Sequence, residues 1–111
     1  MITLEKLEQM FSGMRAETNW NVDGDMLWGY FFTDADPNRL APVAQHLERV
    51  GYRVVSIYET DDKHRHVLNV ERVETHSPQT LHARNMEFYQ LADQFGLDSY
   101  DGMDVGPVQM R

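Results

Sequence analysis

The chain has 111 residues, no cysteine and a formal net charge of −8, from 18 acidic and 10 basic side chains. This length fits one domain, and the lack of cysteine excludes disulfides, thiolate metal sites and cysteine nucleophiles. The acidic balance disfavours direct nucleic-acid binding, because phosphate backbones repel it, and favours a basic protein partner or a cationic ligand.

The N-terminal segment predicts an amphipathic helix over Leu4–Arg15, because its apolar residues recur at intervals of three and four. Its charges argue against a secretory signal, and no apolar run of about 18 residues predicts a membrane span, so we expect a cytoplasmic location and no membrane contact. The Asn-, Asp- and Gly-rich segment Glu17–Asp25 is typical of a linker. We therefore expect an N-terminal helix and linker over residues 1–24 and one folded domain over residues 25–111.

The segment Met26–Thr33 predicts a strand with apolar residues on both of its alternating faces. That pattern is typical of a central strand covered on both sides. Gly29 in its middle indicates a bulge or the close approach of another backbone. Asp36-Pro37 then provides a cap and a first-turn proline for a second helix, which we expect to end at Gly51.

Two further strands, Tyr52–Glu59 and Arg65–Thr75, are joined by a short turn that favours antiparallel pairing. Ser77 caps a third helix that ends at Gly96, and a short extended segment, Leu97–Val105, follows. The order is a helix and then β-α-β-β-α-β. It predicts an α+β, ferredoxin-like two-layer sandwich with an extra N-terminal helix, and it places the first and third strands in the centre of the sheet.

A two-layer sandwich leaves one face of its sheet without helices, yet the first predicted strand has apolar residues to place there. There are two candidates for covering these residues. The N-terminal helix folds back over this face, or a symmetric partner covers it in a homodimer. We favour the helix, because the linker Glu17–Asp25 is long enough to permit it.

His64 and His66 lie two residues apart, so an extended strand would place both imidazoles on one face, as a metal site requires. The candidate third ligands are Asp61 and Asp62 in the adjoining turn. We interpret the two histidines as exposed polar residues beside a turn, and we predict no metal.

Three aspartates, Asp98, Asp101 and Asp104, recur every third residue near the C-terminus. Residues three apart on a strand point to opposite faces, and Asp98 and Asp104 would lie roughly 20 Å apart. This spacing does not suit a pair of carboxylates acting on one substrate atom, so we predict no catalytic residue and no cofactor. A small enzyme or metal protein that uses the histidines and Asp101 is the weakest of three hypotheses.

The stretch "FGLDSYDGMDVGP" places the triplet Tyr100-Asp101-Gly102 directly after a long helix that ends near Phe95. Together with the element order and the acidic balance, this stretch resembles the family of the ribonuclease E inhibitor RraB, over a range from about Met26 to Val108. The resemblance implies a non-enzymatic, cytoplasmic, ferredoxin-like protein without a cofactor, which binds ribonuclease E and lowers its RNA-degrading activity.

The leading hypothesis is therefore a regulatory module that binds ribonuclease E or another basic protein through an acidic surface. We predict that this surface combines the edge of the last strand with part of the second helix. Its candidate residues are Tyr100, Asp101, Gly102, Asp104 and Glu48.

The second hypothesis is a small-molecule-binding, dimeric ferredoxin-like domain. It rests on the aromatic density of the first strand and places the ligand on the sheet face or in a cleft lined by Trp28, Tyr30 and Tyr58.

Overall fold

The computed structural model describes residues 1–108. Its elements are α1 (Leu4–Glu17), β1 (Met26–Asp34), α2 (Pro37–Arg49), β2 (Arg53–Glu59), β3 (His66–Glu74), α3 (Pro78–Gln94) and β4 (Ser99–Pro107). The predicted helices and strands are confirmed in type and order, with strand boundaries within two residues of those expected.

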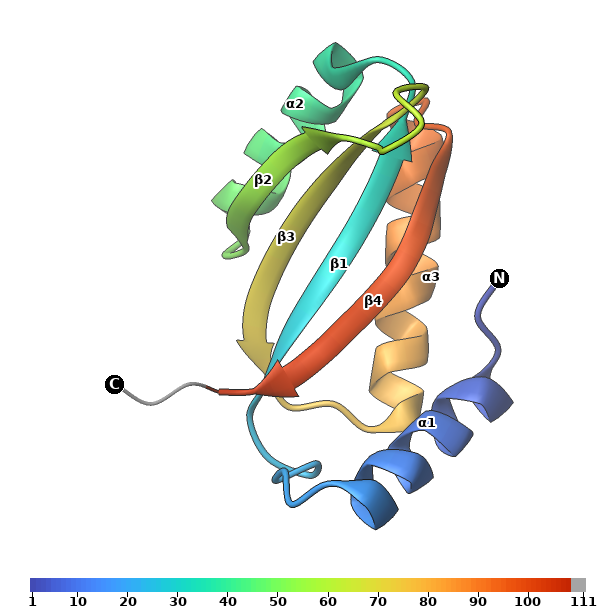
Figure 1. Cartoon of the computed structure of the whole chain (residues 1–111), viewed down its shortest axis with the longest axis vertical. Helices are drawn as coiled ribbons and strands as arrows, with labels where there is room; N and C mark the ends of the chain where they lie inside the picture. Colours follow the sequence, from blue (N-terminus) through green and yellow to red (C-terminus); the bar gives the residue numbers. More distant parts are fainter. Residues whose placement is uncertain (109–111) are drawn as a thin grey trace.

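The four strands form one sheet in the order β2-β3-β1-β4, and every neighbouring pair is antiparallel. This confirms the ferredoxin-like arrangement and the central positions of β1 and β3. Helices α2 and α3 lie together behind the sheet in Figure 1, so the face turned toward the viewer carries neither. We call this uncovered surface the open face.

Local capping explains where the helices begin and end. The side chains of Thr3, Asp36 and Ser77 each accept a hydrogen bond from a backbone amide in the first turn of α1, α2 and α3. Such bonds satisfy amides that have no partner within the helix. Gly51 and Gly96 follow α2 and α3 with positive φ angles of 102° and 69°, the left-handed conformation that ends a helix at little cost to glycine.

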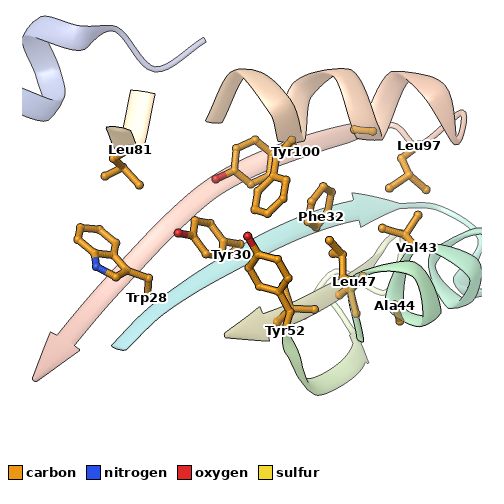
Figure 2. Close-up of a cluster of buried hydrophobic side chains, with 14 of the residues drawn as sticks. Trp28, Tyr30, Phe32, Val43, Ala44, Leu47, Tyr52, Leu81, Leu97 and Tyr100 are labelled. Carbon is orange, nitrogen blue, oxygen red and sulfur yellow. The ribbon is translucent and has the colours of Figure 1, made fainter. Parts of the chain in front are cut away.

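The core lies between the sheet and its helices and is built on alternate residues of β1. Trp28, Tyr30 and Phe32 are at most 1% exposed, and all three point toward the helical layer (Figure 2). Phe88 of α3 lies edge-on to both Tyr30 and Phe32, with ring centroids 4.9 and 5.2 Å apart. Such edge-to-face pairs add to the stabilisation from burial itself.

Helix α1 does not cover the open face, so that prediction is wrong. It packs on the helical side, where Phe11 stacks on Trp28 with ring centroids 5.9 Å apart and the Ile2 amide donates to the Tyr89 hydroxyl of α3. The reason is the direction of the Trp28 side chain. As an inward residue near the start of β1, it needs a covering on the helical side, and Phe11 of α1 provides it. Figure 1 shows α1 beside the end of α3.

We expect Phe11→Ala to lower the free energy of unfolding by about 3 kcal/mol, because it removes a fully buried ring and opens a cavity against Trp28. Urea denaturation measures this change, and Gln9→Ala, exposed on the same helix, should change stability by less than about 0.5 kcal/mol. Equal stability of the two variants would mean that α1 is detached from the core. It would then support the domain boundary predicted between residues 24 and 25, which stays a prediction.

Candidate functional site

The triplet Tyr100-Asp101-Gly102 forms a β-bulge in the edge strand β4. Gly102 pairs with Phe31 of β1, whereas Tyr100 pairs with Phe32, so Asp101 is an extra residue between two consecutive rungs of the ladder. Gly102 has a φ angle of 107°, a conformation that other residues rarely adopt. Glycine beside an extra residue is typical of bulges that bend an edge strand.

Two members of the triplet are buried. Tyr100 is 4% exposed, its ring lies among those of Phe32, Phe88 and Tyr89, and its hydroxyl donates to Asn85 Oδ1 at 2.6 Å. Burial raises the pKa of Tyr100 far above the ordinary value for tyrosine, so the hydroxyl stays a neutral donor. Gly102 is also buried.

The third member, Asp101, lies on the open face. Its carboxylate accepts hydrogen bonds from the hydroxyls of Thr33 and Ser99. Asp104 lies on the same face, because it pairs with Gly29 and a Cβ atom added to Gly29 would meet its Oδ1 at 2.4 Å. Sequence spacing predicted that residues three apart point to opposite faces; the bulge overturns this for Asp101 and Asp104, since one extra residue reverses the alternation between them.

Apolar side chains surround these carboxylates. Leu27 and Phe31 of β1 are half-buried on the open face. Val73 of β3 pairs with Leu27, and Val67 of β3 and Tyr58 of β2 pair with each other two residues beyond Phe31. Tyr58 is 45% exposed and Val73 is 48% exposed. Within residues 1–108, no Lys or Arg side chain forms an ion pair with Asp101 or Asp104. The open face thus offers apolar surface and two carboxylates without a cation.

The structure does not bring Glu48 together with these residues. Glu48 is exposed on α2, in the layer on the other side of the sheet. The cleft predicted from Trp28, Tyr30 and Tyr58 is not formed either. Trp28 and Tyr30 are buried in the core, whereas Tyr58 lies on the open face, because β-strand alternation sends them to opposite sides of the sheet.

The two histidines considered as a metal pair differ in exposure, since His64 is exposed as expected and His66 is half-buried. His64 lies in the β2–β3 turn, where its backbone amide donates to Asp62 Oδ1 at 3.0 Å. His66 begins β3 and lies 3.8 Å from Glu59 Oε2. In the described part of the chain, no three His, Asp or Glu side chains converge as metal ligands do.

A comparison with protein-family models gives a match to RraB, the regulator of ribonuclease activity B, over residues 4–105. The chain belongs to the RraB family. No individual curated protein matches it in sequence. The matched range includes α1, which extends the resemblance beyond its expected start at Met26. RraB proteins are non-enzymatic inhibitors of ribonuclease E. Among residues 1–108, no helix is long and apolar enough to span a membrane.

A buried polar cluster in this RraB-family chain was missed by sequence reasoning. Glu74, at the end of β3, is hydrogen-bonded by Arg84 at 2.6 and 2.8 Å and by the Tyr30 hydroxyl at 2.9 Å, and His76 Nε2 lies 3.6 Å away. No spacing in the sequence links these residues. Such clusters mark active sites in many enzymes, but here every side chain is bonded to another within the core, and the cluster fixes the packing of α3.

The same cluster sets the ionisation of Glu74. Burial favours the neutral carboxyl, but the adjacent His76 and the hydrogen bonds from Arg84 and Tyr30 more than offset this and lower the pKa of Glu74 to about 2. The unfolded chain, with a carboxyl pKa near 4.5, takes up the proton first as the pH falls. The stabilisation is therefore present above about pH 4.5 and is lost progressively toward pH 2.

We expect Glu74→Gln to lower the free energy of unfolding at pH 7 by about 3 kcal/mol, because it leaves the largely buried Arg84 with only the exposed Glu87, 3.6 Å away, as an ion-pair partner. The difference from the unmodified protein should shrink between about pH 5 and pH 2, as measured by urea denaturation at each pH. Glu87→Gln on the exposed surface of α3 serves as control and should show little difference. A Glu74→Gln effect that stays constant over this pH range would contradict the assigned linkage.

The bulge itself is tested by two glycine substitutions in β4. Gly102→Ala should lower the free energy of unfolding by about 1–2 kcal/mol, because alanine at positive φ is strained and the added Cβ would lie 3.1 Å from Ile2 Cδ1. Gly106→Ala is the matched control, since its Cβ meets nothing within 4 Å. Thermal or urea unfolding measures both; equal effects would mean that the bulge conformation at Gly102 contributes nothing specific.

Proposed function

We propose that this chain inhibits a ribonuclease by binding a basic segment of it on the open face of the sheet, and that ribonuclease E is the partner. Membership of the RraB family carries the regulatory part of this proposal. The location rests on Asp101 and Asp104, two carboxylates on one sheet face without a cationic partner in residues 1–108.

The physical basis is charge complementarity combined with apolar contact. A ribonuclease holds its substrate partly through basic side chains that contact phosphates. An acidic protein surface attracts those same side chains, which speeds encounter and fixes orientation. Leu27 and Phe31 of β1 and Tyr58 of β2 supply apolar and aromatic surface beside the carboxylates, and tyrosine is enriched among the residues that carry the binding energy of interfaces.

The proposed roles within the triplet differ. Asp101, together with Asp104, contacts the partner, whereas Tyr100 and Gly102 hold the bulge that presents both carboxylates on one face. Binding by Glu48 stays a prediction. A partner reaches it together with the open face only by wrapping around an edge of the sheet, because α2 lies in the opposite layer.

The test removes the negative charges of Asp101 and Asp104 and keeps the shape of their side chains. We expect the double variant Asp101→Asn/Asp104→Asn to bind purified ribonuclease E at least tenfold more weakly in calorimetry at low salt, with a smaller loss at high salt because screening weakens charge pairs. The amide oxygen of asparagine can still accept from Thr33, so the bulge should persist and the melting temperature should change little.

Glu8→Gln, which neutralises an exposed carboxylate on α1, is the control and should bind normally. Glu48→Gln in the same assay tests the predicted contribution of α2. Unchanged affinity of the double variant, with the unmodified chain binding, would reject the open face as the interface. No binding of ribonuclease E by the unmodified chain would reject the partner.

A further inference from the structure

A row of charged residues crosses the open face and is interrupted at its centre. Cross-strand pairing places Arg53 of β2, Glu71 of β3, Gly29 of β1 and Asp104 of β4 side by side. Arg53 Nε donates to Glu71 Oε1 at 2.7 Å, so the first two members form an ion pair. At the third position there is no side chain, and the fourth is again a carboxylate. Read across the sheet, the charges are positive, negative, absent and negative.

The absent side chain leaves a hollow. Gly29 lies between Leu27 and Phe31, its nearest neighbours on the same face of β1, each about 7 Å away along the strand. A cavity of about 250 Å³ opens there, lined by Leu27, Gly29, Asn69, Glu71, Asp104, Val105 and Gly106. This is smaller than a typical ligand pocket, so it suits one side chain better than a whole small molecule.

Acceptor groups converge on the hollow. The Asp104 carboxylate leans over Gly29, and Asn69 Oδ1 lies 3.6 Å from where a Gly29 Cβ would be. Asn69 Oδ1 is shielded from solvent and has no hydrogen-bond partner among residues 1–108. A shielded acceptor without a donor is costly, so native structures usually satisfy it with a bound group. The Asp104 carboxylate takes up the space directly over Gly29, and the cavity beside it leaves room for a planar cation near both Glu71 and Asp104.

We propose that this hollow, defined by Gly29, Asn69, Glu71 and Asp104, binds one arginine side chain of the partner. A guanidinium in the cavity beside the Asp104 carboxylate restores the alternation of the row, since it adds a positive charge near both Glu71 and Asp104. Its several N–H donors reach the Asp104 carboxylate, and a rotation of the Asn69 side chain brings the unpartnered Oδ1 within reach of the same group. Its flat face lies against Leu27, which lines the hollow. Lysine, with a compact ammonium, matches this spread of acceptors less well.

This inference rests on the proposed function for the identity of the partner, but the recognition of arginine is tested without any partner. The probe is N-acetyl-arginine-N-methylamide, titrated into the ¹⁵N-labelled full chain and followed by amide chemical shifts. We expect saturable shifts at Gly29, Asn69 and Asp104 with a dissociation constant in the millimolar range. The lysine analogue should bind several-fold more weakly, and the citrulline analogue, of similar shape but uncharged, should not bind.

Substitutions in the hollow test whether the amide chemical shifts arise from binding of the probe there. Asp104→Asn and Asn69→Leu should each weaken binding of the arginine probe at least threefold, whereas Glu8→Gln on α1 should leave it unchanged. The proposal is overturned if the arginine and lysine probes shift the same amides equally, if the shifts spread over acidic residues of the helices, or if both variants bind the probe normally.

The two proposals fail separately. If Asp101→Asn/Asp104→Asn weakens ribonuclease E binding but the arginine probe does not bind at the hollow, the interface stands and the arginine site is wrong. If the probe binds at the hollow but ribonuclease E does not bind the chain, the arginine site stands and the partner is wrong.

Discussion

The structure depends on one-sided burial along β1. Trp28, Tyr30 and Phe32 occupy alternate positions and therefore point to the same side of the sheet, where each is almost fully buried. They bring α1 and α3 to that side, through Phe11 and Phe88 respectively. Because the large aromatic residues of the strand lie inward, α2 and α3 lie behind the sheet, α1 packs beside α3, and the opposite face stays open (Figure 1).

The bulge at Asp101 connects this core to the open face. On one side of β4, Tyr100 is held among aromatic rings and by Asn85, which fixes the position of the strand. On the other side, the extra residue lets Asp101 and Asp104 share the open face despite a spacing of three. A single backbone irregularity, supported by a glycine at positive φ, thus determines that Asp101 and Asp104 lie on the same face of the sheet.

Some carboxylates of the molecule have a cationic partner and others do not. The core carboxylate Glu74 has its cation, Arg84, and Glu71 at the surface has Arg53. Asp104, in the same cross-strand row as Glu71, has none within residues 1–108. Under the proposed function, this exposed carboxylate attracts the basic groups that also attract phosphate.

The sequence by itself determined the element types, their order, the caps at Thr3, Asp36 and Ser77, and the ferredoxin-like topology, because these follow from local periodicity and capping chemistry. It also indicated the family, through the Tyr100-Asp101-Gly102 triplet. Periodicity and capping cannot show on which side of the sheet α1 packs, because that depends on which side the Trp28 ring points to.

Only the tertiary structure decided on which face Asp101 and Asp104 lie and which side chains surround Gly29. Alternation predicted Asp101 and Asp104 on opposite faces, and a register shift against β1 placed them on the same one. The gap at Gly29 acquires its neighbours Glu71, Asn69 and Asp104 from two other strands, distant in sequence. Cross-strand register fixes such sites, and it is set by the packing of the whole sheet rather than by any short stretch of residues.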